Sequence, residues 1–167
     1  MPKYRLLSSE ELDLFKKEFI DYLVVNGITA DDWVKMKVTN QVKSNKIIDL
    51  FSDVILEKVL RKSHYIKKIN YDSIFCFHYQ SEQIVMIGLQ TKDKTAIAPY
   101  IQGQESMENI EILSASKEYK LQREMELFKM IESGASISDG STYKRIVLLS
   151  VSEADTKLNN SSNKEAI

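Results

Sequence analysis

The apolar residues that follow Ser8 recur every three or four positions, which is the spacing of one face of a helix. Ser8 and Glu11 match the Ser-x-x-Glu pattern of a capping box, in which the two residues satisfy each other's free backbone amides. Asn26-Gly27 ends the pattern, because glycine adopts the left-handed conformation that terminates many helices. We therefore predict one helix between Ser8 and Gly27, with its buried positions at Leu12, Phe15, Phe19 and Leu23.

Two further helices are predicted before residue 63. Thr29 precedes Asp31 and Asp32, and a threonine cap followed by acidic residues favours the positive end of a helix dipole. This second, short helix carries Trp33 and Met36 on one side. A third helix should run from about residue 42 to residue 62 and be the most buried, since its apolar positions cover a wide arc. These positions are Ile47, Ile48, Phe51, Val54, Ile55, Val59 and Leu60.

The hydrophobic pattern changes after residue 72. Residues 73–79 and 84–90 are rich in aromatic and β-branched side chains, and the polar residues 80–83 separate them. Two such runs joined by a short polar turn predict an antiparallel hairpin. Residues 95–98, ended by Pro99, and residues 110–114 are further candidate strands, with a loop at 102–106 between them.

A helix is predicted over residues 116–132, with a buried stripe and a stop at Gly134. Residues 137–141 predict a turn with capping chemistry, and residues 143–151 fit either a helix or a strand. Apolar content falls from residue 152 onward, so residues 152–167 are predicted to be a disordered tail. The stripe of the helix consists of Leu121, Met125, Phe128 and Ile131.

Together these elements predict an α+β fold. We expect a single domain over residues 1–151, in which the N-terminal helices pack on a small antiparallel sheet and one or two helices follow toward the C-terminus. The 43% of hydrophobic residues is enough for a true core.

Charge and targeting signals narrow the function classes. The 167 residues carry 23 Lys and Arg against 24 Asp and Glu, a net charge of -1. Such a balance provides no long-range field to attract polyphosphate or an anionic membrane. The N-terminus lacks the apolar stretch of a signal peptide, and no apolar run approaches the roughly 20 residues that span a bilayer. With the single cysteine Cys76, which cannot form an internal disulfide, these features predict a cytoplasmic protein that does not contact membranes.

Cys76 and His78 are the first candidates for chemistry, because residues two apart in a strand share one face. They could form a nucleophile pair or half of a metal site. A structural zinc site needs four ligands, and His64 has no partner at ligand spacing. We expect Cys76 to pack in the core and predict no catalytic residue, no metal and no cofactor.

Two clusters of charge need an interpretation. Asp49, Asp53 and Glu57 line one helix face, which we expect to be solvated. A basic cluster with interleaved tyrosines could contact nucleic acid. The near-neutral net charge argues against that partner, and the helix dipole explains cations near a helix C-terminus. The cluster consists of Lys58, Arg61, Lys62, Lys67 and Lys68, with Tyr65 and Tyr71.

The most distinctive polar loop is Ser138-Asp139-Gly140-Ser141. It could present amides and hydroxyls to an anion at a helix start, so Ser138, Asp139 and Tyr143 are candidate ligand-binding residues. Capping of a helix and a tight turn explain the same residues. No phosphate-loop or dinucleotide glycine pattern accompanies them.

Several segments in combination resemble a small uncharacterised bacterial family, a domain of unknown function. The similarity extends over about residues 3–146 and is weakest between residues 92 and 108. It implies a compact α+β cytoplasmic domain, with no activity, cofactor or site residue to carry over. The segments that carry the resemblance are ITADDW (28–33), LFSD (50–53), ELFKMIE-x-G (126–134) and ISDG (137–140).

Without a catalytic constellation, the leading hypothesis is a non-enzymatic module that binds or regulates through a protein partner or as a homodimer. The alternative is a small-ligand-binding protein or enzyme, with its site between the sheet and the loop at residues 138–140. Nucleic-acid binding through residues 58–68 is a third, weaker reading. Fold class by itself does not decide among these functions.

Overall fold

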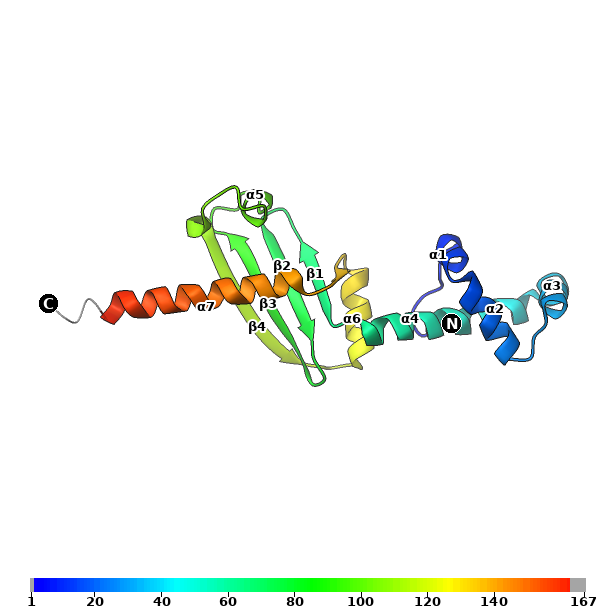
Figure 1. The fold of residues 1–167 in the computed structure, drawn as a ribbon. Coiled ribbons are helices and arrows are strands. Elements are labelled where there is room, and N and C mark those ends of the chain that lie inside the picture. The colour runs from blue at the N-terminus through cyan, green and yellow to red at the C-terminus, as the bar shows by residue number, and fades with distance from the viewer. Residues whose placement is uncertain (1, 163–167) are drawn as a thin grey trace. The chain divides into compact units, whose positions relative to one another are not determined.

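The computed structural model describes residues 2–162, and the chain divides into two compact units, residues 1–62 and residues 63–167. We call them the N-terminal unit and the C-terminal unit. The N-terminal unit is entirely helical, with helices at each of the predicted places (Figure 1). Its helices are α1 (Ser9–Leu14), α2 (Lys16–Val25), α3 (Ala30–Thr39) and α4 (Gln41–Lys62).

The predicted capping box at Ser8 and the predicted cap at Thr29 are both present, and the cap at Thr29 is also a capping box. The Ser8 hydroxyl accepts from the Glu11 amide at the start of α1, and the Thr29 hydroxyl accepts from the Asp32 amide at the start of α3. The single helix expected after Ser8 is instead two helices, because Phe15 leaves helical geometry (φ −99°, ψ 22°). No glycine or proline marks this break.

The break at Phe15 serves a cluster of buried side chains in the N-terminal unit. Phe51 of α4 is 1% exposed, and the Phe19 ring lies 4.9 Å from it at a steep angle. Leu12 and Phe15 pack against the same cluster from α1 and from the break. Since a helix can present only one stripe, two short helices cover Phe51 more fully than one straight helix would.

The C-terminal unit is a five-stranded antiparallel sheet with helices, in the strand order β4-β3-β2-β1-β5. The predicted hairpin is present as β2 and β3, and the ambiguous segment 143–151 is helical. The strands are β1 (Tyr65–Ile69), β2 (Ser73–Tyr79), β3 (Gln83–Thr91), β4 (Ile110–Glu118) and β5 (Ser136–Ser138). The helices are α5 (Ala98–Ile101), the 3₁₀ turn η1 (Met107–Asn109), α6 (Arg123–Glu132) and α7 (Ser141–Ser162).

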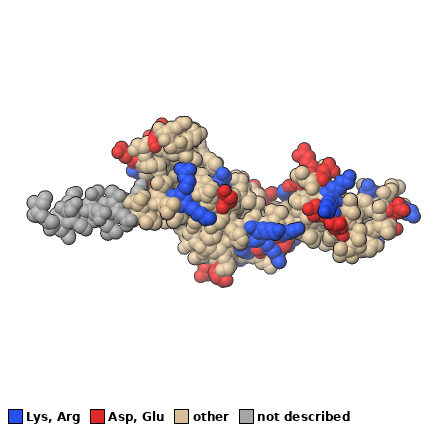
Figure 2. Space-filling model, viewed as in Figure 1, with Lys and Arg blue, Asp and Glu red and all other residues tan. Residues whose placement is uncertain are grey.

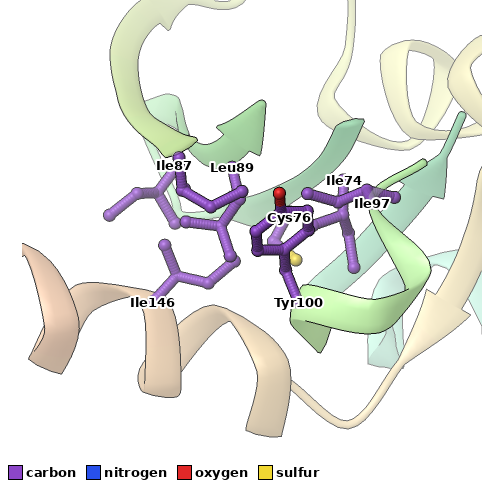
Figure 3. Close-up of a cluster of buried hydrophobic side chains, with 8 residues drawn as sticks. Ile74, Cys76, Ile87, Leu89, Ile97, Tyr100 and Ile146 are labelled. Carbon is purple, nitrogen blue, oxygen red and sulfur yellow. The ribbon is translucent and has the colours of Figure 1, made fainter. Parts of the chain in front are cut away.

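Helix α7 crosses one face of the sheet and buries an apolar cluster there (Figures 1 and 3). Ile146 projects from α7 toward Cys76 and Ile87, which lie opposite each other on β2 and β3. Phe77 and Ile84 belong to the other face, where they line a small cavity together with Met130 of α6. The fold class is therefore α+β, as predicted.

Three expectations for the secondary structure were wrong. Residues 95–98 form no strand. The Ile97 amide donates to the Tyr71 carbonyl, and the Ile97 side chain is buried in the core just before α5. Two strands, β1 and β5, were missed. Residues 114–118 belong to β4, and the helix predicted from residue 116 begins only at Arg123.

The buried stripe predicted for that helix is also displaced. Leu121 precedes α6 and is 45% exposed, whereas Leu127, which the stripe left out, is fully buried. At the other end of the chain, α7 extends to Ser162, through much of the segment predicted to be a disordered tail. Residues 163–167 of that predicted tail lie outside the described residues.

Candidate functional site

The polar groups of the predicted loop at residues 138–141 bind one another at the start of α7. Asp139 Oδ1 accepts from the Ser141 amide at 2.9 Å and from the Ser141 hydroxyl at 2.7 Å. The Gly140 amide donates to the Ser138 hydroxyl at 3.3 Å. The hydrogen bond from the Ser141 amide lowers the pKa of Asp139. Local bonds therefore use the polar groups that the loop could have offered to an anion.

An aromatic group surrounds Tyr65 of β1. The His78 ring stacks on Tyr65 with 4.3 Å between centroids, and the Tyr143 ring lies 5.5 Å from Tyr65. Ser138 is the register partner of Tyr65 on β5, and Gly140 packs against the tyrosine ring. Of the three predicted ligand residues, the structure thus brings Ser138 and Tyr143 to Tyr65, while the Asp139 side chain is exposed.

The surroundings of His78 favour the neutral imidazole. Burial lowers its pKa, and the positive charges of His64, Arg123 and Lys144 lower it further. Gln80 Nε2 lies 3.4 Å from His78 Nδ1. The Tyr143 ring lies 5.6 Å from the imidazole, so His78 packs against both tyrosines. Among the side chains that the structure describes, no carboxylate hydrogen-bonds to His78 to orient it as a base.

Cys76 shares the His78 face of β2, as predicted, and lies inside the apolar cluster (Figure 3). The thiol is 1% exposed, and burial raises its pKa to about 11. Nucleophilic chemistry requires the thiolate, which is scarce at neutral pH with such a pKa. Among the side chains that the structure describes, no group of three or more His, Cys, Asp and Glu residues could hold a metal ion.

Two carboxylates of α4 contradict the expectation of a solvated helix face. Asp53 accepts from the backbone amides of Lys3 at 2.7 Å and Tyr4 at 3.0 Å. Glu57 accepts from the Lys3 ammonium at 2.8 Å and the Arg61 guanidinium at 2.9 Å. The predicted solvated face therefore anchors the N-terminal segment. The bonds to Lys3 and Tyr4 lower the pKa of Glu57 to about 2.

The basic residues between 58 and 68 are divided between the two units: Lys58, Arg61 and Lys62 belong to α4, and Lys67 and Lys68 belong to β1. Arg61 is engaged by Glu57, and Lys67 and Lys68 point to opposite faces of the sheet because they are adjacent in β1. Lys68 reaches the Ser133 hydroxyl at 3.4 Å. On the face shown in Figure 2, basic side chains occur in several separate groups with acidic side chains among them.

A partly enclosed apolar cavity of about 220 Å³ lies between the sheet, the α5 segment and α7. Ile74 and Leu89 of the sheet, Met107 of η1 and Ile146 of α7 contribute to its wall. Its charged lining residues are Arg145 and Glu105. The alternative site predicted beside the loop at residues 138–140 would lie elsewhere, since none of Ser138, Asp139 and Tyr143 lines this cavity.

The sequence patterns predicted a strand over residues 110–114 and missed that β4 extends to Glu118 and lies at the edge of the sheet. The Lys92 amide donates to the Asn109 carbonyl at 2.9 Å, so residue 109 faces β3. Antiparallel ladders alternate, and the residues of β4 that face away from β3 are therefore the even-numbered ones. They are Ile110, Ile112, Ser114, Ser116 and Glu118. The Ile110 amide donates to the Met107 carbonyl of η1. The amides and carbonyls of Ile112, Ser114 and Ser116 have no hydrogen-bond partner among the described residues.

The centre of this edge is open and uncharged. Residues 114–116 are all exposed and small, and the charged side chains of β4 lie toward its ends at Glu111, Lys117 and Glu118. Proteins usually protect a long edge strand with a central charge, a proline or a cover. The opposite edge of the sheet is β5, which has only three residues.

Residues 1–150 match the model of a family of unknown function (DUF6495). The chain belongs to this family. The match confirms the resemblance to an uncharacterised family and assigns no activity. No curated protein and no solved structure matches the chain. None of the helices in the described part of the chain is long and apolar enough to cross a membrane.

Proposed function

We propose that this protein is a non-enzymatic binding module that takes an extended segment of a protein partner onto β4. The observation that carries the proposal is the row of outward amides and carbonyls along this nine-residue edge strand. A partner strand would satisfy these groups with main-chain hydrogen bonds, the interaction that provides affinity in strand addition.

The surroundings of the edge support this use. Ser114, Ala115 and Ser116 leave room for a partner's side chains, since small residues do not obstruct an approaching strand. The other candidate sites are engaged within the chain: Asp139 binds Ser141, and Cys76 is buried in the core. We place the protein in the cytoplasm, where a single unpaired thiol such as Cys76 stays reduced.

Capture from a native lysate on immobilised full-length chain tests the proposal, with Ser114→Pro as the decisive variant. Proline removes the outward amide of Ser114 and leaves the ladder to β3 intact, because edge positions tolerate proline when the amide faces solvent. Ser114→Ala is the matched control, since it keeps the amide. Proteins retained by wild type and Ser114→Ala and lost with Ser114→Pro support strand addition. Retention that is equal for all three baits rejects it.

The cavity of the C-terminal unit supports a second candidate, binding of a small apolar anion. Its volume of about 220 Å³ is below the roughly 300 Å³ of typical ligand pockets, so only a small molecule fits. Arg145 and Glu105 are its charged lining residues, and Arg145, which has no ion pair among the described residues, is the group that would bind the anion. A thermal-shift series with short-chain fatty acids should stabilise wild type and not Arg145→Gln. No shift in the wild type rejects this candidate.

A further inference from the structure

We infer that the strand accepted by β4 is β4 of a second copy of this chain. The two strands would pair antiparallel about a two-fold axis at Ser114, and the two five-stranded sheets would become one continuous sheet. This inference rests on the proposed function, because it names the partner that the edge takes. Three features support it: which residues of β4 direct their amides and carbonyls away from β3, the charges of β4, and the path of α7.

The outward-facing residues of β4 permit this register. Residues of β4 that point outward must form the hydrogen-bonded pairs of any new ladder, and these are the even-numbered residues. An axis at Ser114 sets Ser114 opposite its own copy and Ile112 opposite Ser116 of the second copy. All of these residues are outward-facing. Side chains also keep their faces, since even positions meet even positions.

The charges select this register among its neighbours. With the axis at Ser114, Glu111 lies opposite Lys117 of the second copy, and symmetry repeats the pair. These are non-hydrogen-bonded pairs, in which side chains come closest. Displacing the axis by one position sets Glu111 opposite Ala115 or Tyr119 instead. Only the register centred on Ser114 joins the two opposite charges.

Lys117 can serve this contact while it keeps its own partner. Its ammonium bonds Glu126 Oε2 of α6 at 2.6 Å, and its side chain remains 52% exposed. An ammonium has three donors, so a second carboxylate can bind beside the first. The exposed Glu111 side chain has no hydrogen bond or ion pair among residues 2–162.

The path of α7 is compatible with pairing. Ile146 of α7 lies in one cluster with Ile110, and Ile112 packs against it, so α7 crosses β4 near Ile112. The helix continues beyond this edge of the sheet (Figure 1). In the dimer, the second α7 would cross near the residue opposite Ser116. Four positions along a strand separate the two crossings by about 13 Å, enough for helices about 10 Å wide.

Light scattering coupled to size-exclusion chromatography, over a concentration series of the full-length chain, tests the inference. Wild type and Ser114→Ala should be dimers that dissociate on dilution, and Ser114→Pro should be a monomer at all concentrations. Far-ultraviolet circular dichroism of the monomer establishes that the variant is folded. If monomeric Ser114→Pro has an altered spectrum, the charge variants Glu111→Lys and Lys117→Glu decide whether the chain dimerises through β4.

A charge-exchange pair tests the register. Glu111→Lys and Lys117→Glu should each weaken dimerisation about tenfold or more, because each places like charges opposite one another at two symmetric positions. An equimolar mixture of the two variants should restore the wild-type dissociation constant, since every altered charge then meets its opposite in the other chain. Restoration by mixing cannot arise from damage to either fold.

The outcomes separate the inference from the proposed function. A wild-type chain that stays monomeric, while a captured protein is lost with Ser114→Pro, overturns the second copy as partner and leaves strand addition standing. A dimer that survives Ser114→Pro and both charge variants uses another surface and overturns the inference. A monomeric chain whose captured proteins are indifferent to Ser114→Pro overturns both.

Discussion

Gly140 lies directly against the ring of Tyr65, so that a Cβ at Gly140 would be 2.6 Å from Cδ2 of the tyrosine. The residue also has a φ of +83°, in the left-handed region that favours glycine. This approach joins the start of α7 to β1, and it holds the tyrosine ring on which His78 stacks. Gly140, in the loop predicted from sequence to bind a ligand, thus packs against β1.

Gly140→Ala should therefore destabilise the protein by about 2–4 kcal/mol, since strain of the left-handed backbone adds to overpacking against the ring. Gly134→Ala is the matched control: its φ is +98°, and no atom lies within 4 Å of the added Cβ. The control should cost about 1 kcal/mol. Denaturant unfolding measures both. Equal losses would mean that the Tyr65 contact carries no energy.

Glu57→Gln should weaken the N-terminal unit at pH 7 and have little effect at pH 2. The pKa of Glu57 is lowered to about 2 by Lys3 and Tyr4, so its contribution is present above the unfolded pKa of 4.5 and is lost as the pH falls toward 2. We expect about 1 kcal/mol at pH 7, because the group is partly solvated.

Fluorescence of Trp33 reports on this unit, since its ring packs against Phe19 at 5.2 Å. Asp49→Asn on the same helix is the control, because Asp49 has no hydrogen bond or ion pair among the described residues. An effect of Glu57→Gln that is the same at both pH values would contradict the assignment to the ionised carboxylate.

His78→Phe should flatten the dependence of stability on pH in the range where the pH falls below about 6.5, the ordinary pKa of histidine. Burial lowers the pKa of His78 from its ordinary value of 6.5, so the unfolded chain binds the proton more tightly than the folded one. Wild type consequently loses stability as the pH falls through this window. Phenylalanine keeps the stacking on Tyr65 and cannot titrate. A proton NMR titration that places His78 at or above 6.5 would refute the argument.

Cys76 should react slowly with an aromatic disulfide reagent at pH 8 and rapidly in denaturant. The thiol is buried in the cluster of the C-terminal unit, and its pKa is raised to about 11. Labelling then requires opening of the sheet, so the rate follows the free energy of that opening. Complete labelling of the native protein within seconds would show that the thiol is accessible.

Tyr79→Phe should leave stability unchanged or raise it by up to about 1 kcal/mol. The Tyr79 hydroxyl is buried and has no hydrogen-bond partner among the described residues. Its burial therefore costs desolvation free energy that no hydrogen bond offsets, and phenylalanine removes this cost. Tyr100→Phe is the contrasting variant, because the Tyr100 hydroxyl accepts from Asn109 at 2.9 Å. That variant should lose about 1 kcal/mol. Calorimetric unfolding compares the two.

The elements predicted correctly depend on neighbours in sequence. The two capping boxes use residues three apart, and the hairpin of β2 and β3 joins runs across a short turn. The missed elements depend on distant partners. Tyr65 in β1 pairs with Ser138 in β5, and neither segment is apolar or regular enough to predict a strand.

The candidate sites divide in the same way. That Cys76 and His78 share a face follows from strand periodicity, and the structure confirms it. That Asp53 binds the backbone of Lys3 follows from no local pattern, because the two are 50 positions apart. The open edge of β4 also required the strand order, since only the order shows which strand lacks a neighbour.

By itself the sequence determined the starts of α1 and α3, the central hairpin, the α+β class and the placement of the single cysteine in a core. Those follow from periodicity and capping, which act over a few residues. Tertiary structure alone decided that Phe15 divides a helix, that Ser114 lies on an unpaired edge and that the polar loop packs on Tyr65. Each of these depends on which distant segment occupies the adjacent space, and short-range forces do not specify that segment.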